Sequence, residues 1–242
     1  MPNISSKILR KLRSFDTPTI CNLIELFDVR PRHTGFMDAR IKACFPDMPP
    51  MVGFAATATF RSSAPPREGD AYAGTEVQAE RFGELCGPPV VVFQDLDDPP
   101  IAATFGEVMC TTYQTFGAVG LITSGAGRDL EQVHALGFPT FTSGTICAHG
   151  YCHVLQVHVP VHVGGVAVYP NDLLHGDLNG VTTIPHQIAT ELADIGDEFV
   201  AAEGVILDAL RSGTPSVTRL RQARAEAQAR IEKLRAQVSR TI

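Results

Sequence analysis

Three charged residues in the middle of the chain, Glu107, Arg128 and Asp129, have the types and spacing that could bind and activate a small acid. Gly106-Glu107 follows one apolar segment and Arg128-Asp129 follows the next. Carboxylate oxygens are preferred ligands of Mg²⁺, which keeps several waters when it binds to a protein. A guanidinium presents a fixed fork of donors that matches a carboxylate. The set could therefore hold a carboxylate substrate beside a divalent cation.

These residues can act together only if the elements before them place them at one edge of a sheet. PVVVFQDL (89–96) and AVGLITSG (118–125) are continuous apolar segments, as in strands buried on both faces. We predict helices over 106–117 and 128–137, each closed by a glycine, and a third strand, FPTFTSGT, over 138–145. This β-α-β-α-β order implies parallel strands with right-handed crossovers.

In such a unit each helix begins at the carboxyl end of the preceding strand, where ligands usually bind. The turns 105–107 and 124–129 are therefore expected at the same edge. Two helix N-termini, with the backbone amides of Val108 and Met109 at the first, would form an anion site there. An acidic residue at a helix start also complements the helix dipole, so the two carboxylates have an explanation that needs no ligand.

The N-terminal part of the chain predicts a helix, a strand and a loop. SFDTPTICNLIELF (14–27) places its apolar residues on one helical face, with Ser14 or Asp16 available as the N-cap. MVGFAATATF (51–60) is strand-like, and SSAPPREGDAYAGT (62–75) is a loop rich in proline and glycine.

The C-terminal part of the chain has a different pattern of apolar residues. Residues 154–185 alternate with period two and contain turn sequences, which is typical of antiparallel hairpins. We expect a helix from about 185 to 210, broken near Gly204, and then a linker at 212–216. The helix expected over 219–240 carries all seven Lys and Arg of the tail, against two Glu. It is either an arm for a partner or for assembly, or a solvated helix that covers its own subunit.

Composition and charge exclude several classes of protein. The chain has 242 residues, and 44% of them are hydrophobic, which excludes disorder of the whole chain. Its net charge of −6 argues against a general nucleic-acid binder. No apolar run approaches the roughly 18 residues of a membrane span, and the N-terminus lacks the apolar core of a signal peptide. Six scattered cysteines in a chain of this size are expected to be reduced thiols in a cytoplasmic protein.

Other motifs give weaker signals. Gly125-x-Gly127 after a predicted strand matches the first two glycines of a dinucleotide-binding loop. The third glycine would stand at position 130, where this chain has Leu130, so the motif is incomplete. Cys147, His149, Cys152 and His153 have zinc-binding side chains, but their spacing matches no strong zinc template. No G-x-S-x-G sequence supports a serine nucleophile.

Glu107, twenty intervening residues and then Arg128-Asp129 resemble the acidic-X20-Arg-Asp signature of the RraA-like family. That family includes 4-hydroxy-4-methyl-2-oxoglutarate/4-carboxy-4-hydroxy-2-oxoadipate class II aldolases and regulators of ribonuclease E activity. The surrounding sequence agrees over roughly residues 15–200, in GEVM (106–109), GAVGLITSGAGRD (117–129), GFPTFTSGT (137–145), VPVHVGGVAVYPNDLLHGDLNGVTTIP (159–185) and MVGFAATATF (51–60). One departure is Ser124-Gly125, where family members commonly have Asp-Gly.

The resemblance implies an α/β fold of the swivelling β/β/α type, like the phosphohistidine domain, in homotrimers or homohexamers with sites near subunit interfaces. We place this single domain at residues 1–211, with 212–242 as a linker and basic C-terminal helix. The resemblance also implies that Asp129 is the metal ligand, that Arg128 binds the substrate carboxylate and that segment 106–109 cradles the substrate. Glu107 stands where the family often has Asp and would hold metal-bound water. The implied cofactor is Mg²⁺ or another divalent cation such as Mn²⁺.

The implied activity is a divalent-metal-dependent class II aldolase that cleaves 4-hydroxy-2-oxo acids to pyruvate, with Glu107 and Arg128 as catalytic residues. Oxaloacetate decarboxylation passes through the same pyruvate enolate and should accompany it. The partner is then a small 2-oxo acid, with no nucleic acid and no membrane. The alternative is a non-enzymatic, protein-binding regulator of the ribonuclease E inhibitor type. The set of Glu107, Arg128 and Asp129 favours the enzyme, because a binding module has no need of it.

Overall fold

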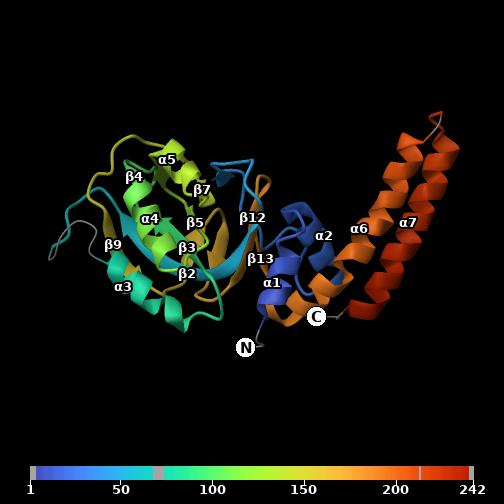
Figure 1. Ribbon diagram of the computed structural model, residues 1–242, viewed down its shortest axis with the longest axis horizontal. Helices are drawn as coiled ribbons and strands as arrows, with labels where there is room; N and C mark the ends of the chain where they lie inside the picture. Colours follow the sequence, from blue (N-terminus) through green and yellow to red (C-terminus); the bar gives the residue numbers. More distant parts are fainter. Residues whose placement is uncertain (1–3, 68–73, 213, 240–242) are drawn as a thin grey trace.

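An eight-stranded mixed sheet forms the centre of the computed structural model, which describes residues 4–67, 74–212 and 214–239 (Figure 1). Its strands are, in order, β1 (Lys42–Ala43), β7 (Thr140–Thr142), β5 (Gly120–Thr123), β3 (Pro89–Asp95), β2 (Met51–Arg61), β12 (Leu173–Asp177) and β13 (Gly180–Ile184), and β9 (His153–Val157) also pairs with β2. β2, β3, β5 and β7 are parallel neighbours, whereas β1, β9, β12 and β13 pair antiparallel. Parallel pairing in the centre and antiparallel pairing after residue 153 both confirm the sequence prediction.

A second, three-stranded parallel sheet includes the two short strands that directly precede α4 (Glu107–Thr115) and α5 (Leu130–Ala135). It consists of β4 (Ala103–Phe105), β6 (Ala126–Gly127) and β8 (Gly144–Thr145). The strand predicted at 138–145 is therefore two short strands in different sheets, β7 and β8, whereas the strand predicted at 118–125 contains β5 and ends just before β6. The chain passes from a main strand through this small sheet into α4 and α5. The small sheet thus sets where both helices begin.

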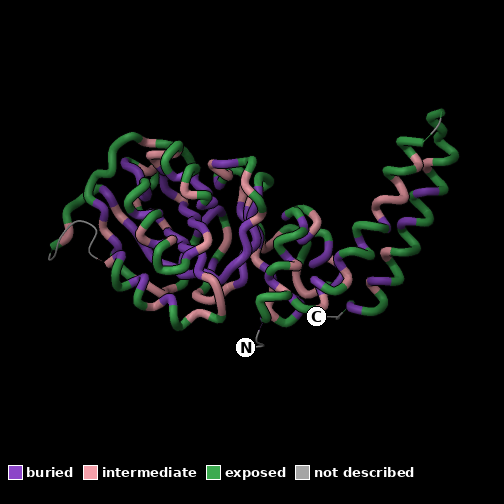
Figure 2. Tube along the Cα trace, viewed as in Figure 1, coloured by how far each residue is buried: buried purple, intermediate pink, exposed green. Residues whose placement is uncertain are grey.

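The central strands are buried on both faces, which explains their continuous apolar sequence. Val91 and Phe93 of β3 pack in a core with α4 and α5, including the fully buried Tyr113. Val90 and Val92 face the other way, into a core completed by the hairpin of β10 (Val161–Val163) and β11 (Val166–Val168). Figure 2 shows this buried centre.

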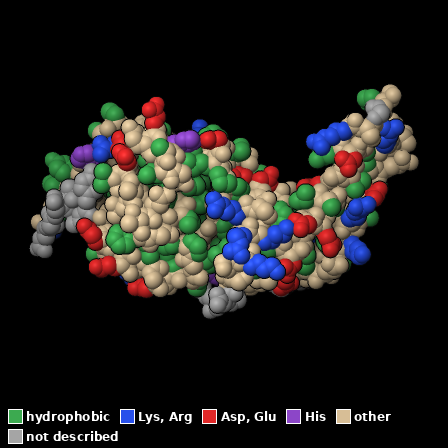
Figure 3. Space-filling view, viewed as in Figure 1, with side chains coloured by type: hydrophobic (Ala, Val, Ile, Leu, Met, Phe, Trp, Pro, Cys, Tyr) green, Lys and Arg blue, Asp and Glu red, His purple; other side chains and the backbone are tan. Residues whose placement is uncertain are grey.

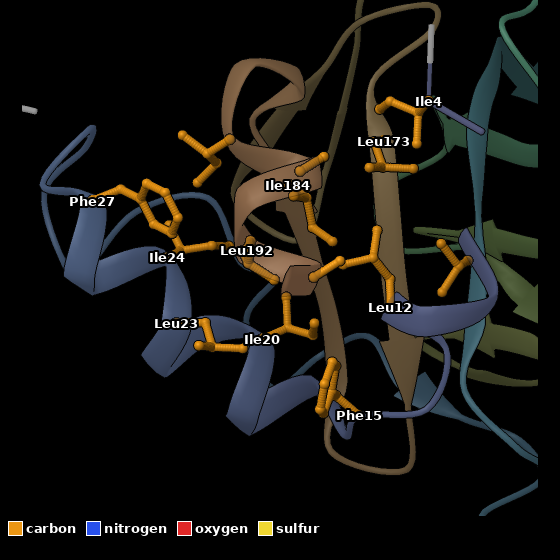
Figure 4. Close-up of a cluster of buried hydrophobic side chains, with 14 of the residues drawn as sticks. Ile4, Leu12, Phe15, Ile20, Leu23, Ile24, Phe27, Leu173, Ile184 and Leu192 are labelled. Atoms are coloured by element: carbon orange, nitrogen blue, oxygen red, sulfur yellow. The ribbon is translucent and has the colours of Figure 1, made fainter. Parts of the chain in front are cut away.

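A third core joins the terminal helices to β12 and β13 (Figure 4). α2 (Thr17–Phe27) begins after Asp16, whose side chain accepts a hydrogen bond from the Thr19 amide at 2.8 Å. Of the two predicted N-caps, Asp16 is therefore the one used. The sequence prediction missed α1 (Ser6–Leu12), a seven-residue helix capped by Ser5.

The C-terminal helices form an antiparallel hairpin that extends away from the sheets (Figure 1). α6 (Ala189–Arg211) runs unbroken through Gly204, so the predicted break there is wrong. Packing against α7 (Val217–Val238) outweighs the roughly 1 kcal/mol that glycine costs in a helix. Leu234 and Val238 of α7 join the third core, so α7 covers its own subunit, one of the two sequence interpretations.

The surface shown in Figure 3 has more Lys and Arg over the terminal helices than over the sheets. Within the described ranges, no helix combines the length and apolar character that crossing a bilayer requires. Residues 68–73 of the predicted loop, 213 of the linker and 240 of the predicted helix lie outside those ranges.

A buried histidine fastens the N-terminal helices to the sheet. His175 of β12 is fully buried; its Nε2 donates to the Leu12 carbonyl at 3.1 Å, and its Nδ1 accepts from the Thr17 hydroxyl at 2.9 Å. Asp177 accepts from the Thr17 amide at 2.9 Å. Burial, the largest influence, lowers the pKa of His175 to about 4, so the ring is neutral in the folded chain at neutral pH.

We expect the free energy of unfolding to fall by about 2 to 3 kcal/mol between pH 7 and pH 4.5 on account of His175. The unfolded ring takes a proton near pH 6.5 and the folded ring only near pH 4, so stability is full above 6.5 and is lost below it. Chemical denaturation at both pH values should show this loss in the wild type and a smaller loss in His175→Asn. His33→Asn, at an exposed histidine, is the control and should keep the wild-type loss. An unchanged loss in His175→Asn would contradict the prediction.

Candidate functional site

The small sheet places Gly106-Glu107 directly against Arg128-Asp129. β4 and β6 are parallel neighbours, and the Arg128 amide donates to the Phe105 carbonyl at 3.0 Å. The two turns predicted to share an edge therefore lie in contact. The structure thus brings together Gly106, the backbone of Glu107, Arg128 and Asp129.

Asp129 holds the two turns together through its side chain. Its backbone is left-handed, with φ at +53°, and its side chain does not cap α5, the helix that it precedes. Instead, Oδ2 accepts a hydrogen bond from the Glu107 amide at 3.1 Å and lies 3.7 Å from Arg128 Nε. The Asp129 side chain thus hydrogen-bonds to the N-terminus of α4 and not to that of α5, the helix that it precedes.

Gly106 is the point of closest approach between the turns. A Cβ added there would lie 2.5 Å from Asp129 Oδ2 and 3.1 Å from Arg128 Nε, so no side chain fits without displacing both. Gly106 is also the N-cap of α4 and offers no side-chain cap. The first bond back to it is from the Cys110 amide at 3.0 Å, so the amides of Val108 and Met109 have no acceptor within the helix.

A small cavity of about 20 Å³ lies beside these groups, and the structure adds residues to it that sequence reasoning did not assign there. Its lining comprises Ala103, Thr104, Phe105, Gly106, Val108, Met109, Arg128, His149 and Cys152. His149 and Cys152 arrive because the Ala103 amide donates to the Ala148 carbonyl at 2.7 Å, which draws their loop to β4. The sequence contains no periodic signal for this contact.

A divalent cation fits the donor set near Gly106 only as a hydrated ion. Within residues 4–67, 74–212 and 214–239, no three His, Cys, Asp or Glu side chains come close enough to form a metal-binding group. The residues weighed as a zinc set therefore form no such cluster. Asp129, whose side chain is 38% exposed, and the exposed Glu107 are two carboxylates, and Mg²⁺ commonly binds one or two while keeping its waters.

A further carboxyl group contacts Thr104, one of the residues that line the crevice. Asp95, at the end of β3, is 7% exposed, and its Oδ2 accepts a hydrogen bond from the Thr104 hydroxyl at 3.4 Å. Burial, the largest influence, raises the pKa of Asp95 to about 6. The sequence signal that could have found it is an acidic residue at the end of the predicted strand 89–96.

Larger cavities lie elsewhere and contain none of the predicted site residues. One of about 310 Å³ is lined by Asp95, Arg40, Ser124 and His162 among others. Another, of about 760 Å³, lies between the segments 33–36 and 183–187. The first combines Arg40 with the carboxylates of Asp95, Asp97 and Asp98, but neither is lined by Glu107, Arg128 or Asp129.

Comparison with known proteins gives a family match over most of the chain. The model of a family described as "RraA-like: Aldolase/RraA" matches residues 17–183. A putative 4-hydroxy-4-methyl-2-oxoglutarate aldolase of Halalkalibacterium halodurans is 36% identical over 99 residues, which is 40% of this chain and 47% of that protein. Protein DlpA of Legionella pneumophila is 27% identical over 112 residues, which is 46% of this chain and 18% of that protein. The match therefore spans less than half the length of either relative.

Two solved structures share the fold. An uncharacterized protein from Pseudomonas syringae has a TM-score of 0.71 at 22% identity, covering 93% of this chain and 95% of that one. Streptomyces coelicolor RraAS2, described as an unusual member of the RNase ES inhibitor RraA protein family, has a TM-score of 0.66 at 22% identity, covering 84% and 97%. At these identities the likeness concerns the mixed α/β fold with its C-terminal helices.

Proposed function

The chain belongs to the RraA-like family, which includes aldolases and ribonuclease E inhibitors, and from that premise we propose that it is a divalent-metal-dependent class II aldolase. Its reaction would be cleavage of 4-hydroxy-2-oxo acids to pyruvate, accompanied by decarboxylation of oxaloacetate. The observation that carries the proposal is the contact of Arg128 and Asp129 with the start of α4 at Gly106.

The substrate carboxylate binds between Arg128 and the first turn of α4 in this proposal. The guanidinium supplies charge and a fixed fork of donors, and the amides of Val108 and Met109 supply two more donors at the positive end of the helix. Asp129 would hold the divalent cation directly and Glu107 would hold it through water. Bound there, the cation would supply Lewis-acid stabilisation of developing negative charge.

The retro-aldol step needs a proton acceptor and a stabilised enolate. The C4 hydroxyl loses its proton, the C3–C4 bond breaks, and C4 becomes a carbonyl while the bonding electrons pass to C3 as the enolate of pyruvate. Protonation of C3 then gives pyruvate. Glu107, exposed at the first residue of α4, orders the water that takes the hydroxyl proton. Arg128 holds the carboxylate throughout, so the reacting carbons stay in place.

The decisive test is pyruvate release from a panel of 4-hydroxy-2-oxo acids and from oxaloacetate, with and without EDTA. We expect Mg²⁺-dependent or Mn²⁺-dependent release that EDTA abolishes. A failure to release pyruvate from any compound would contradict the proposal. The alternative function within the family, a non-enzymatic regulator that binds another protein, would then be favoured.

Substitution of Gly106 by alanine should lower kcat/KM about tenfold or more, because reacting groups tolerate little displacement. The new Cβ must push Asp129 and Arg128 away from their present positions. Gly106 has extended backbone with φ at −153°, so the effect would come from this contact and not from backbone strain. Gly83→Ala is the matched control, since a Cβ there meets nothing within 4 Å. Equal activity of the two variants would contradict the assigned contact.

We also propose the swivelling β/β/α description of the fold, the boundary between 211 and 212, and assembly as a homotrimer or homohexamer. Exposed apolar side chains on the α6 face, Val200 and Leu207, support further packing there. Light scattering at micromolar concentration tests assembly, and a monomer would contradict it.

All six cysteines are free thiols, as the sequence predicted, which supports a cytoplasmic location.

A further inference from the structure

The hairpin of α6 and α7 has small side chains at its buried positions and large apolar side chains on its surface. Within residues 200–212 and 214–230, the buried positions are alanines: Ala202, Ala223 and Ala227. Four larger apolar side chains of the same segments are 45% to 66% exposed: Val200, Leu207, Leu210 and Val217. Valine and leucine are normally among the most buried residues and gain free energy by leaving water. The hairpin therefore presents an apolar surface that its own subunit leaves uncovered.

Gly204 leaves one face of α6 open to close approach. It lies between Val200 and Leu207, at the spacing that places all three on the same helical face. A Cβ at Gly204 would meet nothing within 4 Å, so the packing of this subunit does not require the glycine. Glycine is typical of sites where another backbone comes close. Figure 1 shows this part of the hairpin extending away from the sheets and from α1 and α2, so the face is free to receive a further helix.

The two helices of the hairpin carry opposite charge. α6 has six Asp and Glu against one Arg, whereas α7 has six Lys and Arg against two Glu. Figure 3 shows both kinds of charge along the hairpin. Two ion pairs on these helices do not cross between them: Arg230 pairs with Glu226 within α7, and Asp197 pairs with Lys11 of α1. The hairpin therefore has an acidic helix and a basic helix side by side.

This charge pattern is complementary to itself. When two copies of a surface meet around a two-fold axis, every contact between them occurs twice. Such an axis can place the acidic α6 of each copy against the basic α7 of the other. A partner with charge of a single sign would be attracted by one helix and repelled by the other. A second copy also brings the same uncovered apolar surface, so it is the partner that fits the hairpin.

We infer that the α6–α7 hairpin pairs with the same hairpin of a second copy around a two-fold axis, as a four-helix bundle. The exposed apolar side chains supply affinity, and the charges select the partner and its orientation. The inference is independent of the proposed reaction. It requires an even number of chains, so of the two proposed assemblies it selects the homohexamer, as two trimers joined through their hairpins.

Exchanged charges test this pairing in the full chain. One variant carries Glu198→Lys with Asp208→Lys on α6, and the other carries Arg224→Glu with Arg230→Glu on α7; all four side chains are exposed. Each variant places like charges across the two-fold contact, so light scattering at micromolar concentration should give half the wild-type molar mass. An equimolar mixture places opposite charges across the contact again and should restore the wild-type mass.

The mixture separates contacts between copies from contacts within one hairpin. Each variant keeps like charges on its own α6 and α7, so a restored mass in the mixture can come only from pairing between copies. Full mass for either variant alone, or a mixture that stays at half mass, would overturn the inference. A wild-type trimer would overturn it and leave the proposed trimeric assembly standing. A wild-type monomer would contradict both.

The apolar part of the contact is tested by Leu207→Asn. The dissociation constant of the two halves should rise about tenfold or more, because the amide cannot replace the buried leucine surface. Leu178→Asn is the matched control, since Leu178 is a 60% exposed leucine between β12 and β13 and should leave this dissociation constant unchanged. Equal dissociation constants for the two variants would overturn the assignment of the contact to this face of α6.

Discussion

Substitution of Asp129 by asparagine is expected to lower metal-dependent turnover at least a hundredfold while leaving the fold intact. In our proposal, Asp129 is the direct ligand of the divalent cation, and the neutral amide is a much weaker ligand than a carboxylate. The amide oxygen can still accept the hydrogen bond from the Glu107 backbone. Asparagine also tolerates the left-handed backbone found here, at φ +53°. The loss should therefore report charge and not folding.

Two measurements separate a loss of metal binding from a loss of structure. Mn²⁺ titration followed by electron paramagnetic resonance should give a clearly weaker dissociation constant for Asp129→Asn than for the wild type. Chemical denaturation should give nearly equal free energies of unfolding for the two proteins.

Asp28→Asn is the matched control for this variant. Asp28 has the same left-handed backbone, with φ at +54°, but it ends α2, far from Gly106 in the chain. Full activity and unchanged Mn²⁺ binding are expected there. Full turnover by Asp129→Asn, or by the wild type in EDTA, would contradict the metal mechanism.

The sequence predicts the main sheet well because its central strands are buried on both faces. Continuous apolar residues mark 89–96, and the glycines at 117 and 137 mark the helix ends. It does not predict the small sheet of β4, β6 and β8, since strands of two or three residues have no period to detect. The break predicted at Gly204 is absent for a related reason. The packing of α6 against α7 outweighs the low helix propensity of glycine.

The candidate site also contains residues that the sequence predicts and residues that it does not. Gly106, Arg128 and Asp129 follow from position, because turns after parallel strands share an edge. His149 and Cys152 reach the crevice through backbone hydrogen bonds such as that of the Ala103 amide to the Ala148 carbonyl, and sequence spacing cannot encode those contacts. Long-range contacts of this kind depend on tertiary structure alone.

Replacement of Arg128 by lysine should lower kcat/KM for pyruvate-forming substrates roughly ten- to a hundredfold, although the charge is kept. A guanidinium binds a carboxylate with two parallel hydrogen bonds in fixed geometry, whereas an ammonium is a mobile point charge. Loss of one charge-assisted hydrogen bond costs about 1.5 to 3 kcal/mol, which corresponds to that range. The ammonium would also be free to pair with Asp129, whose Oδ2 lies 3.7 Å from Arg128 Nε at present.

Oxalate inhibition distinguishes this role from a general effect on the surface. Oxalate mimics the pyruvate enolate in shape and charge, so its inhibition constant should rise in Arg128→Lys in parallel with the loss of kcat/KM. Arg40→Lys is the control, because Arg40 is exposed and pairs with Asp38 at 2.7 Å outside the crevice. If Arg128→Lys behaves like Arg40→Lys, then Arg128 does not hold the substrate carboxylate. A protein-binding regulator would then account for the contact between Arg128 and Asp129 better than an aldolase does.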